Sequence, residues 1–470
     1  MKDYKEYFKG KKITMLGLGL LGRGLNDAKF LAECGADLLI TDLKTKEQLA
    51  PTLKKLAKFK NIKYVLGEHR LEYFRDCDMV LKSAGVPLDS PYILEAQKNN
   101  IPVEMDESLF AKLADDVITV GVTGTRGKTT TTYIIYEILK SSFGNRVHLG
   151  GNIKGLATLP LLKKVKPGDI VVMELSSWQL QGWGDSKISP HISVFTNFLN
   201  DHLNYYEKVS KDREDALQKY FDDKALIFKN QKENDFLILN SEIEKEIKSR
   251  FAGKIKSKII LPNNKQIDNW DLKIKGEHNK THILQAIEVA KILGVEDKII
   301  KKAVENFSGV EGRQEFLREY KGIKIYNDTT ATTPDATIVA LKALSDSRIK
   351  IQDSGIIGKN HESRVMNPES KRIILIMGGA DKKLDMSELI KEVPKYCKKV
   401  ILLAGTGTEK LEGKINGAVV KSLKEGLLEA LKEAKKGDIL ILSPAFASFG
   451  MFTNEFDRGE QFVRLIKALK

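Results

Sequence analysis

The chain has 470 residues, of which 30% are charged and 42% hydrophobic, a composition typical of a globular protein with roughly two to four domains. No apolar run approaches the ~20 residues of a membrane-spanning helix, and the first residues lack the apolar core of a secretory signal. Three scattered cysteines argue against a disulfide framework or a zinc site. We therefore expect a cytoplasmic protein without a membrane partner.

The net charge of +14 comes from 77 Lys and Arg against 63 Asp and Glu. The excess is mostly lysine spread along the chain, without a basic patch interleaved with aromatic residues. This pattern predicts a solvated basic surface with a mild attraction for anionic small molecules. Nucleic acid is not an expected partner.

The first element is "ITMLGLGLLGRGLNDAKFLAECGADLLITD", which predicts a strand, a glycine turn, a helix and a second strand. Gly17, Gly19 and Gly22 match G-x-G-x-x-G, and Asp42 ends the second strand about 20 residues further on. The simplest interpretation is an NAD site. We rank the NAD site below a site for another nucleotide diphosphate, because a Rossmann-like unit can bind any nucleotide diphosphate.

The second element is "DVITVGVTGTRGKTTTTYIIYEILK", again strand, turn and helix. Gly127-Lys128-Thr129 matches the end of the Walker A pattern, but Val122 stands five residues before Gly127 where glycine is expected. The context predicts a phosphate site at a helix N-terminus. The backbone N–H groups of 124–129 should face phosphate oxygens, with Lys128 near the β and γ phosphates and Thr129 at Mg²⁺.

Two later stretches offer metal ligands. "VVMELSSWQL" places Glu174 at the carboxyl end of an apolar strand, where ligands of open α/β sheets gather and where Mg²⁺ finds oxygen. "TNFLNDHLNYY" supplies Asn200, Asp201 and His202, which is also a common turn composition.

A third α/β start lies near "IKIYND", with further strands "RIILIMGG", "KVILLAGTG" and "DILILSPA". Two segments look inserted: 204–221 is charged and predicts helix, and 351–372 predicts a surface loop with an exposed His361. The predicted fold is α/β with three domains. These are a Rossmann-like domain (1–105), a central P-loop ATPase-type domain with a mostly parallel sheet (106–312), and a Rossmann-like C-terminal domain (313–470).

Taken together, these stretches resemble the Mur ligases, ATP-dependent amide-forming enzymes of peptidoglycan synthesis, over nearly the whole chain. The family carries G-x-x-G-T-x-G-K-[TS], which "GVTGTRGKT" matches, so the glycine spacing is that of this family. Arg126 stands where Asn is usual, and we expect it to be tolerated because backbone amides form the cradle.

The resemblance is closest to the branch that adds D-glutamate to UDP-N-acetylmuramoyl-L-alanine. It implies a monomer whose partners are these two substrates and ATP, with two Mg²⁺ ions. It also implies phosphorylation of the substrate carboxylate to an acyl phosphate, which the amine of glutamate attacks.

On the uridine side, the "LGLGLLGRG" turn resembles the family's nucleotide site. "KSAGVP" (82–87) resembles its S-P-G loop with Ala84 in place of Pro, and "GGNIKG" and "ELSSWQ" match its muramoyl-side motifs. The implied contacts with the UDP-linked substrate are Gly19, Leu20, Leu21, Gly22, Asp42, Ser83, Gly85, Asn152, Ser176 and Gln179.

For catalysis, the resemblance implies Mg²⁺ binding by Glu174 and a second metal ligand in His202. Lys224 of "FDDKALIF" matches a lysine that the family carboxylates on its side chain, although about eight extra residues separate it from His202. The implied catalytic residues are Lys128, Glu174, His202 and Lys224, and the implied metal ligands are Thr129, Glu174, His202 and Lys224.

The remaining ATP contacts come from three further motifs. "GEHNKTHILQA" resembles a helix start whose Asn279 faces adenine, with His282 replacing a second Asn; "EGRQE" carries a hinge arginine; "YNDTTATTP" carries a ribose-side aspartate, with Thr330 replacing a lysine. The implied ATP contacts are Gly124, Thr125, Arg126, Gly127, Lys128, Thr129, Thr130, Asn279, Arg313 and Asp328.

For the amino acid, "GGADKK" and "SPAFASFGMFTNEFDRG" resemble the acceptor motifs. In the second, Glu455 occupies the place of a phenylalanine and Phe456 follows. The implied glutamate contacts are Thr332, Lys382, Ser448 and Phe456.

Three alternatives stay open. One is a related amide ligase that adds L-glutamate or another amino acid, such as a folylpolyglutamate synthase, which has no need of the uridine-type turn. Another is a nucleotide-binding scaffold without turnover, against which the intact GKT, Glu174 and Lys382 argue. The third is an NAD-dependent dehydrogenase, which would not need the loop at 121–132.

Overall fold

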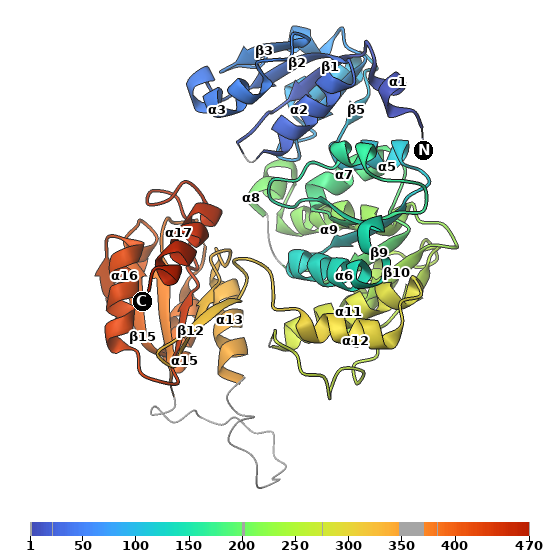
Figure 1. Ribbon diagram of the computed structural model, residues 1–470. Coiled ribbons are helices and arrows are strands. Elements are labelled where there is room, and N and C mark those ends of the chain that lie inside the picture. Colours follow the sequence, from blue (N-terminus) through green and yellow to red (C-terminus); the bar gives the residue numbers. More distant parts are fainter. Residues whose placement is uncertain are drawn as a thin grey trace. The chain divides into compact units, whose positions relative to one another are not determined.

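The computed structural model describes residues 2–20, 22–199, 203–274, 276–346, 371–382 and 384–469 (Figure 1). Its contacts divide the chain into two compact units. Unit 1 holds Met1–Asn269 and Thr281–Val304, and unit 2 holds Trp270–Lys280 and Glu305–Lys470. Unit 1 contains two sheets and unit 2 contains one, and the α/β fold class is confirmed. The domain boundaries at 105 and 312 stay predictions.

The first sheet of unit 1 is parallel, in the order β3-β2-β1-β4-β5. Its strands are β1 (Lys12–Leu16), β2 (Asp37–Asp42), β3 (Ile62–Leu66), β4 (Met79–Lys82) and β5 (Val103–Glu104). Its helices are α1 (Tyr4–Phe8), α2 (Arg23–Glu33), α3 (Lys46–Leu56), the short 3₁₀ helix η1 (Leu71–Phe74) and α4 (Pro91–Lys98). The strand order reverses beside β1, so the Gly17–Gly22 turn after β1 lies where open α/β sheets bind ligands.

The second sheet of unit 1 is also parallel, in the order β11-β10-β9-β6-β8-β7. Its strands are β6 (Ile118–Thr123), β7 (Val147–Gly151), β8 (Ile170–Glu174), β9 (Ile192–Phe195), β10 (Phe236–Leu239) and β11 (Lys258–Ile260). Its helices are α5 (Asp106–Leu113), α6 (Lys128–Phe143), α7 (Ser177–Asp185), α8 (Leu203–Tyr206), α9 (Arg213–Lys229), α10 (Ser241–Arg250), α11 (Glu277–Ile292) and α12 (Asp297–Asn306), with η2 (Gly144–Arg146), η3 (Leu159–Lys163) and η4 (Glu207–Val209).

One apolar core runs through both sheets of unit 1. Phe30 of α2 belongs to it together with Phe110 of α5 and Trp183 of α7, each at most 1% exposed. In Figure 1, α5 and α7 lie at the junction between the two sheets. The central strands β6, β8 and β9 of the second sheet are buried almost continuously, as parallel strands covered on both faces must be.

Unit 2 has a six-stranded sheet in the order β12-β13-β17-β14-β15-β16. Its strands are β12 (Glu315–Tyr320), β13 (Ile323–Asn327), β14 (Ile373–Gly378), β15 (Cys397–Leu403), β16 (Ala418–Val420) and β17 (Ile439–Leu442). Its helices are α13 (Pro334–Asp346), α15 (Ser387–Tyr396), η6 (Thr408–Leu411), α16 (Leu423–Glu433) and α17 (Glu455–Lys467). The β12–β13 pair is antiparallel, an edge hairpin that the sequence did not reveal.

Apolar cores cover both faces of this sheet. Leu341 of α13 and Leu389 of α15 belong to one core, and Leu427 of α16 and Phe462 of α17 to the other. His361 and the loop predicted around it lie outside the described residues. Among the helices that the structure describes, none is long and apolar enough to cross a membrane.

Candidate active site

The phosphate loop joins β6 to α6 as the sequence predicts. Gly124 has φ +140°, and a Cβ there would lie 1.9 Å from the hydroxyl oxygen of Thr196. Gly127 has φ +79°, and a Cβ would lie 2.1 Å from the ring of His282 in α11. Both positions therefore require glycine for the backbone angle and for the close approach of a neighbouring element.

Asn197, just after β9, holds the tip of this loop. Its carbonyl oxygen accepts from the Thr125 amide and its Oδ1 from the Arg126 amide, both at 2.9 Å. The Arg126 carbonyl in turn accepts from Thr196 Oγ1 at 2.6 Å and from Asn197 Nδ2 at 3.2 Å. The expectation that all amides of 124–129 face phosphate is therefore wrong for Thr125 and Arg126. The amides of the first turn of α6, which have no carbonyl partner within the helix, keep that role as a prediction.

Two lysines meet at this loop. Lys128 Nζ donates to the carbonyl oxygens of Gly124 and Thr125 at 3.0 Å, and Lys224 Nζ donates to that of Gly124 at 2.8 Å. Lys224 is 1% exposed and lies 4.6 Å from the centre of the Tyr220 ring, one turn earlier on α9. The Tyr220 hydroxyl contacts Thr125 Oγ1 at 3.3 Å. Thus α9 brings Lys224 to the phosphate loop despite the long preceding connection, which contains α8 and η4.

Glu174 ends β8 beside the first turn of α6. Its Oε2 accepts from Thr129 Oγ1 at 2.6 Å, and its Oε1 accepts from Asn152 Nδ2 at 3.2 Å. A carboxylate and a hydroxyl this close fit Mg²⁺, a hard cation that binds oxygen. His202 lies outside the described residues. Within the described part of the chain, no cluster of three or more His, Cys, Asp or Glu side chains could hold a metal.

Asp42 organises the uridine-type turn. Its Oδ2 accepts from the Leu18 and Gly19 amides and its Oδ1 from the Lys44 amide, all at 2.9 Å. Burial opposes ionisation, but the Gly19 and Lys44 amides outweigh it and lower the pKa of Asp42. Both carboxylate oxygens therefore already serve the protein backbone, and the contact with uracil stays a prediction.

Other residues predicted for the UDP-linked substrate lie around the same turn. Leu20 is 56% exposed, and a Cβ on Gly17 would lie 2.7 Å from Ser83 Oγ, so the turn and the 82–87 loop are adjacent. Gly22 is the N-cap residue just before α2, with φ +89°, and Gly85 has open space beside it. Leu21 lies outside the described residues.

Ser176 and Gln179 cap α7 reciprocally. The Ser176 amide donates to Gln179 Oε1 at 2.8 Å, and the Gln179 amide donates to Ser176 Oγ at 3.3 Å. The Gln179 Nε2 also donates to Glu107, and Gln179 is fully buried. The E-L-S-S-x-Q run is thus at least in part a helix-capping motif that positions Glu174 just before it.

The ATP residues predicted from later motifs belong to unit 2. Asp328 follows β13; its Oδ2 accepts from Ser443 Oγ at 2.7 Å and its Oδ1 from the Gln314 amide at 3.0 Å. Burial raises its pKa to about 7, against the opposing effects of these two bonds and of Arg313. Asn279 is 7% exposed in the first turn of α11.

The predicted glutamate residues come together in part. Lys382 Nζ donates to Thr332 Oγ1 at 2.8 Å. A two-residue bridge between Ala380 and Ala447 joins the loop of Lys382 to that of Ser448, which is 3% exposed. Phe456 lies in the first turn of α17.

Sequence interpretation missed Arg458, which is fully buried in unit 2. Its guanidinium donates to Thr329 Oγ1 at 3.1 Å, to the Thr329 carbonyl at 2.8 Å and to the Phe446 carbonyl at 3.3 Å. It thereby joins the loops after β13 and β17, which carry Thr332 and Ser448. Arg458 belongs to the stretch "FDRG", in which nothing in the sequence indicates a role for it.

Comparisons with known proteins decide the family. The family model of the Mur ligase middle domain matches residues 122–306, and that of the Mur ligase MurD-like N-terminal domain matches residues 11–104. A protein of Roseiflexus sp. (strain RS-1) named UDP-N-acetylmuramoylalanine--D-glutamate ligase is 32% identical over 98% of this chain and 99% of its own. The chain belongs to the Mur ligase family.

Further relatives of this Mur ligase agree. Proteins of the same name from Clostridioides difficile (strain 630) and Borreliella afzelii (strain PKo) are 32% and 34% identical over 98% of this chain, covering 99% and 98% of theirs. The fold matches MurC from Thermotoga maritima with a TM-score of 0.59 at 20% identity, covering 98% of this chain and 100% of that one. It also matches MurF from Thermotoga maritima, solved in complex with ADP, with a TM-score of 0.55 at 17% identity, covering 91% and 94%.

Proposed function

We propose that this Mur ligase joins D-glutamate to UDP-N-acetylmuramoyl-L-alanine with cleavage of ATP to ADP and phosphate. The observation that carries the proposal is the convergence of Lys128, Lys224 and the Thr129–Glu174 pair at one phosphate loop. The support for the substrate is that this chain aligns end to end with relatives named for that reaction.

The chemistry requires activation of a carboxylate, because an amine does not displace carboxylate oxygen at neutral pH. Transfer of the γ-phosphoryl group of ATP gives an acyl phosphate, which has a good leaving group. The glutamate amine attacks the acyl carbon, loses a proton, and expels phosphate to leave the amide. The protein's contribution is positioning and charge stabilisation.

Four residues at or beside the loop have a part in this scheme. Lys128, held on its own loop carbonyls, places a positive charge beside the phosphoryl group when it turns outward. The Thr129 hydroxyl and the Glu174 carboxylate would hold Mg²⁺. When bound, Mg²⁺ neutralises the charge of the phosphate oxygens. Asn152 keeps Glu174 oriented through its amide.

We further infer that two Mg²⁺ ions bind, the second through His202 and Lys224, and that Lys224 is carboxylated. Addition of CO₂ to its neutral amine gives a carbamate and releases a proton, replacing a cation by two oxygen ligands. The carbamate keeps one N–H, which can still donate to the Gly124 carbonyl that Lys224 contacts. The proposed active form is a cytoplasmic monomer that acts on small molecules.

The test is phosphate release by the purified chain with ATP, Mg²⁺ and UDP-N-acetylmuramoyl-L-alanine. Stimulation by D-glutamate and not by L-glutamate is expected. Stimulation by L-glutamate alone would support an amide ligase but contradict the proposed D configuration of its amino-acid substrate. No stimulation by either would reject the ligase.

A further inference from the structure

Arg23 connects the uridine-type turn to the metal side of the phosphate loop. It is the first residue of α2, directly after Gly22 of that turn. We propose that Arg23 is a positioning residue that fixes Asn152 and Gln179 for the UDP-linked substrate and, through Asn152, orients Glu174. This inference rests on the proposed function and adds a residue that no motif of the sequence suggested.

The guanidinium of Arg23 divides its donors between two elements. Nη1 donates to Glu107 Oε1 of α5 at 2.9 Å. Nη2 donates to the Gly151 carbonyl at 2.7 Å and to Asn152 Oδ1 at 3.4 Å. The planar guanidinium presents its donors on separate nitrogens in a fixed fork, whereas all three donors of a lysine sit on one rotatable nitrogen and do not reproduce this geometry.

On the first arm, Glu107 holds Gln179. Glu107 is fully buried, and the same Oε1 that accepts from Arg23 also accepts from Gln179 Nε2. Burial, and then Asp106, raise the pKa of Glu107 well above its usual value, while Arg23 lowers it. Burial disfavours the charge of Arg23, but Glu107 and Asp106 outweigh it and raise the pKa of Arg23. Arg23 and Glu107 thus each favour the charged form of the other.

Asp27, one turn later on α2, interacts electrostatically with Arg23, Asp106 and Glu107. Its pKa is raised well above the usual value by burial and by Asp106, while Arg23 lowers it. Arg23 is therefore the cation that offsets three buried carboxyl groups at this junction, those of Asp27, Asp106 and Glu107. Its positive charge favours the ionised forms of Asp27 and Glu107, so removing it would raise the pKa of both groups further.

On the second arm, Arg23 decides which way the Asn152 amide points. Because Oδ1 accepts from Arg23, Nδ2 is the group that faces Glu174 Oε1, at 3.2 Å. The other oxygen of Glu174 accepts from Thr129. An unbroken path of contacts thus runs from the uridine-type turn to Thr129 in the first turn of the phosphate-binding helix α6. Ligand groups held by outer partners of this kind lose roughly 10- to 100-fold in metal affinity or activity when the partner is lost.

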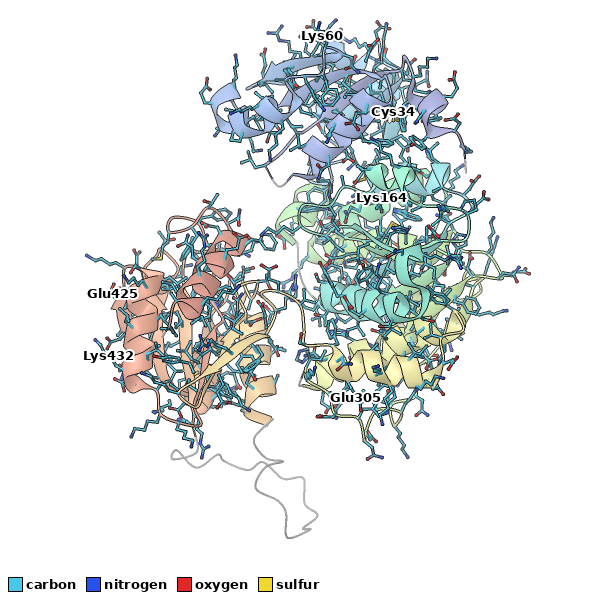
Figure 2. The ribbon with its side chains drawn as sticks, in the orientation of Figure 1. Cys34, Lys60, Lys164, Glu305, Glu425 and Lys432 are labelled. Atoms are coloured by element: carbon cyan, nitrogen blue, oxygen red, sulfur yellow. The ribbon has the colours of Figure 1, made fainter. Side chains whose placement is uncertain are left out.

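A second ion pair joins α2 to the same part of unit 1 and provides a matched control. Lys163 of η3 pairs with Glu33 near the end of α2, and both side chains are at least 30% exposed. Beside them lies a cavity of about 260 Å³ lined by α2 and residues 155–164, with Lys164, labelled in Figure 2, at its edge. This pair has no contact with Asn152, Gln179 or Glu174 among the described residues.

The experiment compares R23K and K163Q with the wild-type full chain. For R23K, we expect the KM for the UDP-linked substrate and the Mg²⁺ concentration for half-maximal rate to rise roughly tenfold. The KM for glutamate should stay within about twofold, and the thermal midpoint should fall by only a few degrees. For K163Q, we expect all kinetic constants to stay within about twofold.

E107Q is a second variant, because a glutamine amide still accepts from Arg23 and Gln179; we expect a smaller rise in the same two constants. Wild-type constants in R23K would overturn the proposal. Equal rises in every KM together with a large loss of thermal stability would also overturn it, since Arg23 would then be structural only. Calorimetric titration of the UDP-linked substrate into R23K needs no turnover, so its result is independent of whether the wild type proves to be a D-glutamate ligase.

Discussion

Lys128 and Lys224 donate to the same carbonyl oxygen, that of Gly124, at 3.0 and 2.8 Å. One lysine comes from the phosphate loop and the other from α9, nearly a hundred residues later. Two lysine side chains from distant parts of the sequence therefore meet at one backbone carbonyl of the phosphate loop. Carboxylation of Lys224 would replace one of the two ammonium groups by a carbamate, whose remaining N–H can still donate to the Gly124 carbonyl.

Replacing Lys224 by alanine tests this directly. We expect K224A to lose roughly 10²- to 10³-fold in kcat, the range seen when one group that stabilises developing charge is removed. Short carboxylates added to the assay should restore part of the rate, because they can occupy the place of the carbamate. The control is K229A, because Lys229 lies on the solvent side of the same helix and pairs with Asp222. This variant should keep its activity. Full activity of K224A without carboxylate would remove Lys224 from the site.

The phosphate loop should not accept a side chain at Gly127. In G127A the methyl group meets the His282 ring, and the backbone keeps a left-handed φ that costs an L-residue ~1–2 kcal/mol. We expect ATP to bind at least about tenfold more weakly in calorimetric titration. G127A/H282A should recover the part of the loss that comes from the contact, with H282A alone as control. Wild-type ATP affinity in G127A would contradict the geometry of the loop.

The sequence revealed the loop but not what surrounds it. Lys128 and Thr129 could be predicted because they end a glycine-rich phosphate-loop motif at a helix start, and Glu174 because it ends an apolar strand. Asn197 and Tyr220 could not, because they act through backbone or hydroxyl contacts that depend on how β9 and α9 pack against the loop. Their residue types are ordinary for their positions, so no motif distinguishes them.

Asp328 should make the stability of the protein depend on pH. Its pKa is about 7 in the folded protein against an ordinary 3.8, so unfolding releases a proton between these values. The free energy of unfolding therefore falls as pH rises from about 4 to about 7. In D328N, the slope should be less negative by up to about 1.4 kcal/mol per pH unit, measured by urea unfolding at several pH values. Parallel slopes in both proteins would show that Asp328 is ionised when folded.

Lys382 should act on the amino acid alone. Its Nζ donates a hydrogen bond to Thr332 Oγ1. A hydrogen bond from a charged lysine to a substrate carboxylate contributes about 1.5–3 kcal/mol to binding. We therefore expect K382A to raise the KM for glutamate roughly 10- to 100-fold while the KM for ATP changes little. The control is K391A, because Lys391 is an exposed residue of α15 that pairs with Glu388. Equal changes in both KM values would argue against a glutamate site at Lys382.

The C-terminal unit shows the same division between what a sequence can and cannot predict. Its strands β13, β14, β15 and β17 were predicted from apolar runs, whereas β12 alternates exposed and half-buried residues at an edge and was not. Thr330 replaces a lysine of the family motif, and its hydroxyl donates to the Gly312 carbonyl at 2.8 Å, so it serves the loop instead of a ligand. The effect of a substitution such as Thr330 for lysine can be interpreted only when the hydrogen-bond partner of the new side chain is known.

The most direct test is the identity of the product. The full chain, incubated with UDP-N-acetylmuramoyl-L-alanine, ATP, Mg²⁺ and isotope-labelled D-glutamate, should give a UDP-linked product heavier by one glutamate residue. One ADP should form for each product molecule. ADP formation without the labelled product, or no ADP at all, would contradict the account of this chain as a D-glutamate-adding Mur ligase.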